Sequence, residues 1–386
     1  MKVLLVHDYS DEAGGAERIV HATKSLLEEA GHDVALYAPA AQGSTANSLF
    51  SLRHYFGVLG EIRRFRPDIM HAHGIFRNVS PSVLLAARRM EVPVVMTLHD
   101  FQIVCPKTSL VNGNLATCAY GFGGRCFYSD CHPRKPLNRV YQGLKALKLT
   151  LHRAIIRRTV SHFLSPSACL MDWTIKSLGV SNISLLPNFI VSQSVPSSSA
   201  PVGNTVLYVG RLTEQKGVDI LIMAIDRVRL TIPDVRLKIA GSGPEEEKLK
   251  RLSDQLNLSG HVTFEGELSH TRVMDGYDSA LLVVIPSKYV ENCSIVGIEA
   301  MSRGKALIAT RTGGLTDLVD DNKTGYLVTP GDVDDLASKI TRAMNNHPML
   351  TDMGAAARAK YERCFSKPAY TQALLSAYRA AIQGAP

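Results

Sequence analysis

The sequence predicts two doubly wound α/β domains, each built on a parallel sheet with helices on its faces. Short apolar runs alternate with stretches of helical periodicity along the whole chain, which is the pattern of buried parallel strands joined by helices. The length of 386 residues accommodates two domains of ordinary size. A charge-free stretch rich in Ser and Pro at 192–204 separates two such series and is typical of an interdomain linker. We therefore expect an N-terminal domain at 1–190, a linker at 191–204, a C-terminal domain at 205–365 and a C-terminal helix at 366–386 that can return to the N-terminal domain.

The first half opens with a strand at 2–6 and a helix at 16–27, which Gly31 ends. Further strands are predicted at 34–38, 69–72 and 92–98, with helices at 58–65 and 83–90 between them. An insert at 101–133 carries four of the seven cysteines, and a basic helix at 134–160 follows it. The alternation then resumes with strands at 162–165 and 183–187 on either side of a helix that ends at Leu178.

The second half repeats the alternation after the linker. Its strands are predicted at 206–209, 237–240, 262–264, 281–285, 306–309 and 326–328. Helical patterns lie between most of them, as at 218–230 and 245–256, and a helical tail runs from Asp332 to the C-terminus. Parallel sheets of this kind bind ligands beyond the carboxyl ends of their strands, so we expect the site in a cleft between the two domains.

The composition excludes several classes of protein. Hydrophobic residues make up 45% of the chain and charged residues 20%, which excludes disordered and fibrous folds. The apolar runs are far shorter than the ~20 residues that span a bilayer, so we expect no integral membrane span. The apolar run at the N-terminus stops at His7-Asp8, too early for a signal peptide. We expect a cytoplasmic protein with reduced thiols, either free or peripheral on the inner face of the plasma membrane.

The net charge of +8 resides in one segment. Residues 101–171 contain ten basic side chains and a single acidic one, Asp130, so the rest of the chain is close to neutral. In the helix at 134–160 the apolar residues fall on one side and most basic residues elsewhere, as in helices that lie on anionic membranes. A helix packed on its own domain with a solvated charged face is the alternative. The apolar side consists of Leu137, Val140, Tyr141, Leu144, Leu147, Leu151 and Ile155.

Two strand-to-helix loops carry paired glycines. Gly14 and Gly15 precede the first helix, and Gly241 and Gly243 follow a strand of the second half. Turns without a Cβ allow backbone N–H groups to approach an anionic or hydroxyl-rich ligand at a helix N-terminus. Tight turns without a ligand are the alternative in both places.

Charged residues lie at the ligand edge of the second domain. Arg211 and Lys216 follow its first strand, where two cations five residues apart can converge on one diphosphate. Glu291 lies on the loop after a later strand, and Glu299 lies on the next helix, for which we expect Asn292 to be the N-cap. The two carboxylates can then address different parts of one elongated ligand. Ordinary solvated charges on a loop and an amphipathic helix are the alternative.

Taken in order, these motifs resemble those of the retaining glycosyltransferases of family 4, a large bacterial group. The donor half of that family is matched by Arg211-x4-Lys216-Gly217, Gly241-Ser242-Gly243-Pro244, Pro286-Ser287 and Glu291-x7-Glu299, with Gly313-Gly314 downstream. The acceptor half is matched by Gly14-Gly15-Ala16-Glu17 and Thr97-Leu98-His99-Asp100. The resemblance covers essentially the whole chain. It implies the GT-B architecture of two Rossmann-like domains with a cleft between them.

The resemblance also implies roles for individual residues. Arg211 and Lys216 would hold the diphosphate of a UDP- or GDP-sugar, and Glu299 would bind the ribose hydroxyls. Glu291 would contact the transferred sugar and His99 would line the reacting centre, so that His99, Glu291, Arg211 and Lys216 act in catalysis. The implied donor-binding residues are Gly15, Arg211, Lys216, Gly241, Gly243, Glu291, Asn292, Ser294, Ile295 and Glu299. The implied acceptor-binding residues are Gly14, Gly15, His99 and Asp100.

Two fixed cations on the leaving diphosphate would make a catalytic divalent metal unnecessary. The one Asp-x-Asp of the chain, at Asp332 and Asp334, starts a late helix and is better explained as a cap. Family members commonly carry Gly-Phe-Gly after the first Glu, where this chain has Asn292-Cys293-Ser294. The larger, polar Asn292 can add a hydrogen bond to the donor sugar or cap the helix.

The cysteines of the insert allow two interpretations. Cys105, Cys118, Cys126 and Cys131 cluster in sequence, with His132 adjacent, but none forms the Cys-x2-Cys pair that is usual in structural zinc sites. A structural zinc ion held by these four thiolates is one interpretation, and reduced thiols that pack a loop are the other.

The sequence thus predicts a hexosyltransferase that uses a nucleoside-diphosphate sugar in bacterial cell-surface polysaccharide or lipopolysaccharide assembly. We expect its saccharide acceptor to be lipid-linked. A nucleotide-sugar epimerase or a synthase of a soluble glycoside is the enzymatic alternative, although neither has a use for a basic helix. A nucleic-acid-binding protein that uses residues 101–171 is the non-enzymatic one. No nucleic-acid-binding module accompanies that segment, so we expect no nucleic-acid partner.

Overall fold

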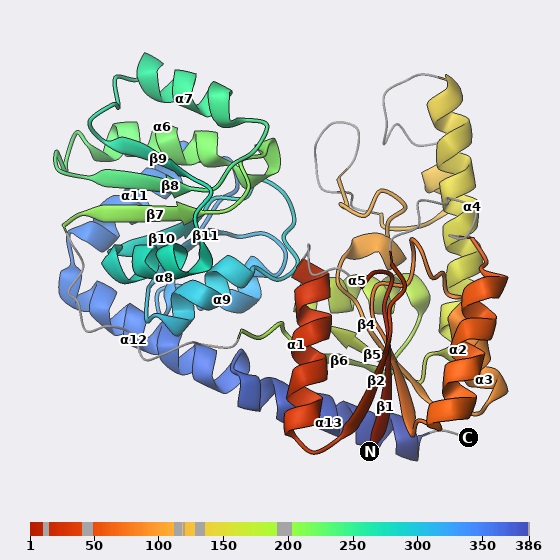
Figure 1. The fold of residues 1–386 in the computed structure, drawn as a ribbon. Helices are drawn as coiled ribbons and strands as arrows, with labels where there is room; N and C mark the ends of the chain where they lie inside the picture. Colours follow the sequence, from red (N-terminus) through yellow and green to blue (C-terminus); the bar gives the residue numbers. More distant parts are fainter. Residues whose placement is uncertain are drawn as a thin grey trace. The chain divides into compact units, whose positions relative to one another are not determined.

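The computed structural model describes residues 1–10, 15–40, 49–111, 118, 120–127, 136–190 and 203–384. The chain divides into two compact units (Figure 1). Unit one comprises residues 1–188 together with 370–386, and unit two comprises residues 189–369. Most of the predicted linker, at 191–202, lies outside the described residues. Each unit is described by itself below.

Unit one is built on a six-stranded parallel sheet with the strand order β2-β1-β3-β4-β5-β6. The side chains of Val3, Leu4, Leu5 and Val6 on β1 are all buried, because helices cover both faces of the sheet. The strands are β1 (Lys2–Val6), β2 (Asp33–Tyr37), β3 (Ile69–Ala72), β4 (Val94–Thr97), β5 (His162–Ser165) and β6 (Ile183–Leu185).

The helices of unit one come from both ends of the chain. They are α1 (Gly15–Glu29), α2 (Leu52–Phe65), α3 (Ser82–Arg89), α4 (Pro136–Thr159), α5 (Ala168–Leu178) and α13 (Lys367–Gln383), with short 3-10 turns η2 (Phe101–Ile103) and η3 (Gly124–Phe127). Helix α13 packs on this unit through buried side chains. The Tyr370 hydroxyl lies 3.2 Å from Thr23 Oγ1 of α1, and the Tyr378 hydroxyl lies 2.7 Å from His71 Nδ1 of β3.

Unit two has a second six-stranded parallel sheet, with the order β12-β11-β10-β7-β8-β9. Its strands are β7 (Thr205–Val209), β8 (Arg236–Ala240), β9 (Val262–Gly266), β10 (Leu282–Ile285), β11 (Leu307–Thr310) and β12 (Gly325–Val328). Its helices are η4 (Glu214–Lys216), α6 (Val218–Val228), α7 (Glu246–Gln255), α8 (His270–Ser279), α9 (Ile295–Ser302), α10 (Leu315–Leu318), α11 (Val333–Met344) and α12 (His347–Cys364).

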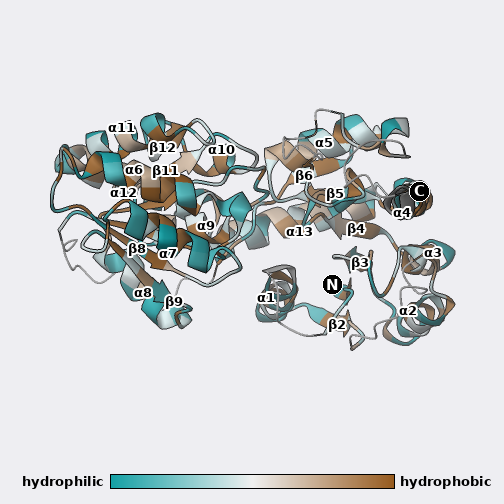
Figure 2. Ribbon diagram, turned by 90° about the horizontal axis from the view of Figure 1, so that it is seen from above, coloured by the Kyte–Doolittle hydropathy of each residue, from teal (hydrophilic) through white to brown (hydrophobic). Residues whose placement is uncertain are grey.

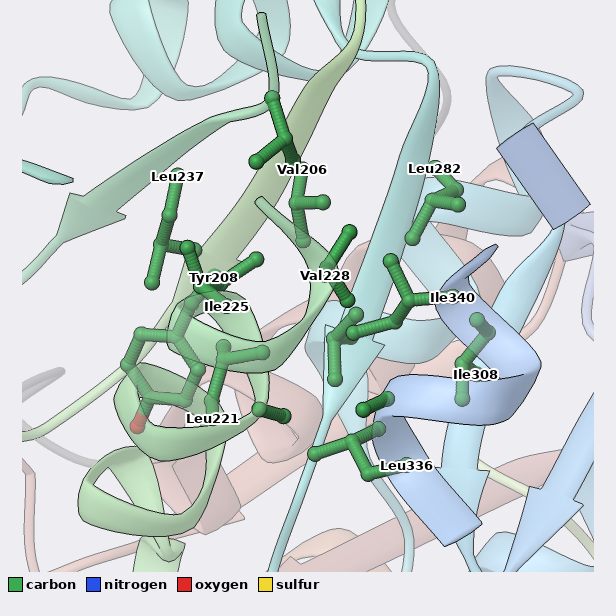
Figure 3. Close-up of a cluster of buried hydrophobic side chains, with 14 of the residues drawn as sticks. Val206, Tyr208, Leu221, Ile225, Val228, Leu237, Leu282, Ile308, Leu336 and Ile340 are labelled. Carbon is green, nitrogen blue, oxygen red and sulfur yellow. The ribbon is translucent and has the colours of Figure 1, made fainter. Parts of the chain in front are cut away.

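One part of the core of unit two lies between its sheet and the helices α6 and α11. Figure 3 shows Leu221, Ile225 and Val228 of α6 and Leu336 and Ile340 of α11 pointing toward strand residues such as Val206 and Leu282. Figure 2 shows the same separation over both units, with hydrophobic residues concentrated in the sheets and a largely hydrophilic α7 at the surface. This packing fixes the strand ends, and therefore the loops that leave them.

Of the two predicted helix N-caps, the structure confirms one and contradicts the other. Asp332 is the N-cap of α11, since its carboxylate accepts hydrogen bonds from the backbone N–H groups of Asp334 and Asp335. The predicted N-cap at Asn292 is wrong: α9 begins at Ile295, and the hydroxyl of Ser294 accepts a hydrogen bond from Gly297 N–H. Asn and Ser both cap helices well, so residue type alone does not decide between positions 292 and 294.

Helix α4 buries a different face from the one the sequence analysis singled out. Its buried side chains are Ala146, Leu149, His152 and Ile156. The predicted apolar side is largely exposed to solvent, with exposed fractions between 47% and 67% for Val140, Tyr141, Leu144, Leu147 and Leu151. No helix among the described residues combines the length and hydropathy that a membrane crossing requires.

Candidate functional site

The strand order of unit two changes direction between β7 and β10. Strands β8 and β9 follow β7 on one side, and β11 and β12 follow β10 on the other. At such a switch point the loops after the two central strands diverge and leave a crevice that binds ligands. Arg211 and Lys216 lie on the loop after β7, and Glu291 lies on the loop after β10. The topology therefore brings the predicted cations and one predicted carboxylate to the same place.

The side chains of these loops meet directly. Lys216 Nζ lies 2.5 Å from Glu291 Oε1, although 75 residues separate them, and Ser287 Oγ donates to the same oxygen at 2.6 Å. The Lys216 side chain is 35% exposed and the Glu291 side chain 18%, so the pair is partly open to solvent. Glu291 is thus held by two donors, and one of them is a cation that a ligand can reach. Ser287, which the predicted site set omitted, follows directly after a buried strand.

Arg211 is positioned through its backbone. The Tyr208 hydroxyl donates a hydrogen bond to Arg211 O at 3.0 Å, and burial raises the pKa of Tyr208, which keeps this hydroxyl protonated. The guanidinium of Arg211 is exposed and forms no ion pair within the described parts of the chain. It is a cation available to an anionic ligand.

The glycines of the loop after β8 serve backbone packing. Gly241 has φ of +139°, and a Cβ there would overlap the carbonyl oxygen of Gly210. A Cβ on Gly243 would overlap Leu212 O, and Leu212 N–H donates to Ser242 O at 2.9 Å. Gly241 and Gly243 therefore allow the loop after β8 to pack closely against the loop that carries Arg211. This contact accounts for both glycines without a ligand, and direct donor binding by them stays a prediction.

Glu299 lies on α9 and is anchored by a tyrosine. Its Oε2 accepts a hydrogen bond from the fully buried Tyr277 hydroxyl at 3.0 Å, and its Oε1 lies 4.0 Å from His270 Nδ1. The carboxylate is 14% exposed, which leaves it accessible at the edge of the unit. Burial raises the pKa of Tyr277, so this tyrosine remains a donor to the carboxylate. Glu299 is thus an acceptor held in place by Tyr277.

The loop after β10 is also tied to a later glycine turn. Gly314 N–H donates to Glu291 O at 2.8 Å, and Gly313, with φ of +52°, leaves no room for a Cβ beside that carbonyl. The Gly313-Gly314 pair thus fixes the backbone of the residue whose side chain meets Lys216. Asn292, Ser294 and Ile295 follow Glu291 into the first turn of α9.

Unit one has its own switch point, between β1 and β3. His7 and Asp8 follow β1, His73 follows β3, and His99 and Asp100 follow β4. The carboxylate of Asp8 is buried and accepts hydrogen bonds from four successive backbone N–H groups, at 76–79, between 2.7 and 2.9 Å. It thereby fixes the loop after β3, in the way that an anion is held by a cluster of amides.

His99 belongs to a chain of imidazoles in which His71 and His73 are fully buried and His99 is half-buried. Its Nε2 lies 2.9 Å from His73 Nδ1, and the two rings are stacked with centroids 5.2 Å apart. His71 continues the chain, with the Thr97 hydroxyl 2.7 Å from its Nε2 and the Tyr378 hydroxyl 2.7 Å from its Nδ1. Burial lowers the pKa of His99 and of His71 to about 3. His99 is therefore a neutral hydrogen-bonding group at neutral pH.

The remaining acceptor-side predictions receive local explanations. Asp100 caps η2 by accepting a hydrogen bond from Gln102 N–H at 2.8 Å, and burial raises its pKa. Gly15 begins α1, and Gly14 lies outside the described residues. His7, Asp8, His71 and His73 were missed by the sequence analysis. The available signal was polar residues within or directly after buried strands, above all His71-x-His73.

The proposed zinc ligands are only partly described. Cys131 and His132 lie outside the described residues, whereas Cys105, Cys118 and Cys126 lie within them. Within the described ranges no three His, Cys, Asp or Glu side chains gather in a way that could hold a metal ion. The structural zinc site stays a prediction.

Comparison with known families accounts for both units. Residues 13–193 match the family described as "Glycosyltransferase Family 4", and residues 195–360 match the family described as "Glycosyl transferases group 1". The chain belongs to the family 4 glycosyltransferases. It is a GT-B protein, with one of the two family matches on each side of residue 194.

Proteins similar to this chain include transferases named for different sugars. The sulfoquinovosyl transferase of Arabidopsis thaliana is 28% identical over 84% of this chain, which spans 59% of that protein. The phosphatidyl-myo-inositol mannosyltransferase of Mycolicibacterium smegmatis is 25% identical over 94% of this chain and 90% of its own. HepE of Anabaena, solved in complex with UDP, superposes with a TM-score of 0.70 over 98% of this chain and all of that chain, at 19% identity.

Proposed function

We propose that this glycosyltransferase moves a hexose from a nucleoside-diphosphate sugar, UDP- or GDP-linked, to a lipid-linked saccharide acceptor, with retention and without a catalytic metal. The pathway we propose is the assembly of bacterial cell-surface polysaccharide or lipopolysaccharide. The observation that carries the proposal is the pairing of Lys216 with Glu291 at the switch point of unit two, with Arg211 on the same loop as Lys216. UDP bound to the Anabaena relative supports the donor class.

The cations act on the leaving group. Negative charge builds on the diphosphate as its bond to the sugar breaks, and cations already in place stabilise that charge. Arg211 supplies a bidentate fork on an exposed loop, and Lys216 a point charge beside it. Because Lys216 already pairs with Glu291, the bound diphosphate would share the ammonium with this carboxylate.

The carboxylates act on the sugar and the nucleoside. Glu291, held by Lys216 and Ser287, would lie beside the sugar and stabilise the positive charge of an oxocarbenium-like transition state. Glu299, held by Tyr277, would accept hydrogen bonds from the ribose hydroxyls. Gly15, Asn292, Ser294 and Ile295 would complete the donor site through backbone or polar contacts.

The acceptor would meet unit one. His99 is neutral and linked to His73, so it can hydrogen-bond a sugar hydroxyl without adding charge at the reacting centre. Gly14, Gly15 and Asp100 complete the proposed acceptor site, although Asp100 already caps its own turn.

A peripheral position on the inner face of the plasma membrane, in the cytoplasm, completes the proposal. The apolar side of α4 is exposed, and Lys145, Arg157 and Arg158 lie on the same helix. Exposed apolar side chains beside basic ones favour binding to an anionic lipid surface. A helix of this kind would bring unit one to a lipid-linked acceptor.

Thermal stability in the presence of nucleotide sugars tests the donor assignment. A ligand that binds only the folded protein stabilises it by RT ln(1 + [L]/Kd) and therefore raises its melting temperature. We expect UDP- or GDP-hexoses to raise it, and anomer-resolved NMR of the product to show retention. No response to any UDP-, GDP- or ADP-sugar would contradict the proposal.

A further inference from the structure

Unit one contains a basic pocket apart from His99 and its histidine neighbours. The pocket has a volume of about 300 Å³ and is lined by four fixed cations, Arg77, Lys107, Lys145 and Lys148, with Gln102 and His152 beside them. None of the described residues that line it is acidic. Its volume is at the lower end of the ~300–1,000 Å³ of small-molecule sites, which suits one polar head group.

Three segments of unit one converge on this pocket. Arg77 lies on the loop after β3, Lys107 follows η2, and Lys145, Lys148 and His152 lie on α4. Lys148 Nζ donates to Phe76 O at 3.1 Å, which joins α4 to the loop after β3. His152 Nε2 lies 3.0 Å from Leu49 O, which connects α4 to the residues before α2. The pocket is therefore bounded by parts that are connected to one another.

The loop that carries Arg77 is fixed by the buried Asp8. Four backbone N–H groups of this loop, including that of Arg77, donate to the Asp8 carboxylate. Asp8 is thereby occupied with amides instead of pairing with Lys148. The guanidinium of Arg77 is exposed and has no ion pair within the described residues. An ammonium has three donors, and the Phe76 carbonyl takes one from Lys148.

The charges around the pocket leave a positive excess. Burial lowers the pKa of Lys148, and the charge of Asp8 acts in the opposite sense. Asp100 is another carboxylate near Arg77; burial raises its pKa, and the charge of Arg77 acts in the opposite sense. Lys145 lies over the Tyr141 ring, 4.5 Å from its centroid. Among the described residues, Arg77, Lys145 and Lys148 outnumber these two carboxylates.

The lining also contains a strained residue. Thr108 has φ of +65°, a left-handed conformation that β-branched residues rarely adopt. Such strain persists where the surrounding structure requires it, and it concentrates at ligand sites. It accompanies a pocket already defined by its volume and its charges.

We propose that this pocket binds a phosphoryl group, as a phosphomonoester or a diphosphate, carried by the acceptor. Several cations with no acidic lining residue match a dianion better than a single carboxylate, and an arginine fork with lysines is the usual recognition set for phosphate. The acceptor role rests on the proposed function, whereas phosphate binding does not. A phosphorylated soluble saccharide and a lipid-linked diphosphate carry the same group.

Calorimetric titration of the full chain with inorganic pyrophosphate, in the presence of saturating UDP, tests the pocket. We expect the double variant Arg77→Gln/Lys145→Gln to bind pyrophosphate about tenfold or more weakly than the unchanged protein, because two charged donors are lost. The matched control is Arg88→Gln/Arg89→Gln, which removes two exposed charges from α3 of the same unit. Thermal melting of each variant verifies that it is folded.

The titration distinguishes the proposed pocket from the proposed donor site. Unchanged pyrophosphate binding in the pocket variant, or an equal loss in the control, would overturn the pocket. If UDP fails to bind the unchanged protein while the pocket variant still loses pyrophosphate, the donor assignment fails and the pocket stands. Displacement of pyrophosphate by glucose 1-phosphate or by a short-chain phosphatidic acid supports the acceptor role and distinguishes a soluble from a lipid source. Displacement by neither contradicts that role.

Discussion

Lys216 is the residue on which the proposed donor chemistry depends most. It supplies a positive charge to a crevice at the switch point and also holds Glu291 at 2.5 Å. Its removal takes away a cation and leaves a partly buried carboxylate with only Ser287 as a donor. One side chain therefore supports two functions, and an uncharged replacement disturbs both.

We predict that Lys216→Ala lowers the turnover of sugar transfer by about a hundredfold or more, as the loss of one preorganised electrostatic contact does in other enzymes. The matched control is Lys288→Ala on the neighbouring loop, because Lys288 pairs instead with Asp219 at 2.6 Å. Steady-state kinetics of both variants measure the difference. Near-normal turnover in Lys216→Ala would mean that the site is misplaced.

The buried imidazoles give a prediction about pH. The pKa of His71 and of His99 is about 3 in the folded protein, against 6.5 for an ordinary histidine, so the unfolded chain binds more protons between these values. The free energy of unfolding should therefore fall as the pH falls below 6.5, by about 1 kcal/mol per histidine on reaching pH 5.5. The raised pKa values of Asp8 and Asp100 act in the opposite direction, because the folded protein then binds more protons than the unfolded chain.

Urea unfolding at pH 7.5 and pH 5.5 measures this dependence. In His71→Gln one of the titrating groups is absent, so the difference between the two pH values should shrink even if the variant is less stable at both. A difference as large as in the unchanged protein would contradict the assignment of the pH effect to this histidine chain.

At the scale of the element, α4 differs from the amphipathic helices around it because it presents apolar side chains on two sides. One side, with Ala146, Leu149 and Ile156, packs on unit one, and the other is exposed to solvent. A second apolar surface on a helix that is already packed requires a further explanation, and a lipid surface provides one.

We predict that the protein binds vesicles of anionic lipids and that binding weakens as salt is added, since the cations of α4 contribute through screened charge. Leu144→Ser/Leu147→Ser should weaken binding, because it removes two exposed apolar side chains without touching the packed side. Co-sedimentation with vesicles measures the effect. Equal binding to neutral vesicles, or none to either kind, would sink the membrane proposal.

The sequence predicts an element well when the element depends on local residues, and poorly when it depends on contacts with distant parts of the chain. Continuous apolar runs such as Leu282–Ile285 predict buried parallel strands, and the structure confirms every predicted strand to within a few residues. Which of the two apolar sides of α4 is buried depends on which one packs on the rest of unit one. Periodicity contains no such information, since both sides fit a helix.

The candidate site divides in the same way. Arg211, Lys216 and Glu291 were predicted from their position after strands, which the topology then brings together. The His71–His73–His99 chain was missed because its members lie on different strands and their contacts arise only when the sheet forms. Asp8 was missed because its partners are backbone amides, which no side-chain pattern reveals.

At the scale of the molecule, unit one is composed of two stretches of chain that are far apart in sequence. Residues 1–188 need α13 to cover Thr23 and His71, and Tyr370, Leu374 and Tyr378 of that helix are fully or almost fully buried. The missing helix would leave apolar surface exposed and deprive two buried polar groups of hydrogen bonds.

We predict that a fragment of residues 1–188 lacks a cooperative melting transition, or melts well below the complete protein, and that a peptide of residues 367–384 restores stability. A Tyr378→Phe peptide should restore less, since the phenolic partner of His71 is absent. Circular dichroism of the fragment with each peptide measures this. A fragment that melts identically with and without peptide would contradict the dependence.

The return of α13 also sets the order of events during synthesis. The last residues of the chain are required to complete its first unit, so unit one cannot finish folding until the ribosome has made all of unit two. At roughly 5–20 residues per second, this leaves the early strands waiting for about ten to forty seconds with uncovered apolar surface. The nascent chain is thus a natural client of chaperones, and a prematurely terminated product would be left with an unfinished first unit for proteases to remove.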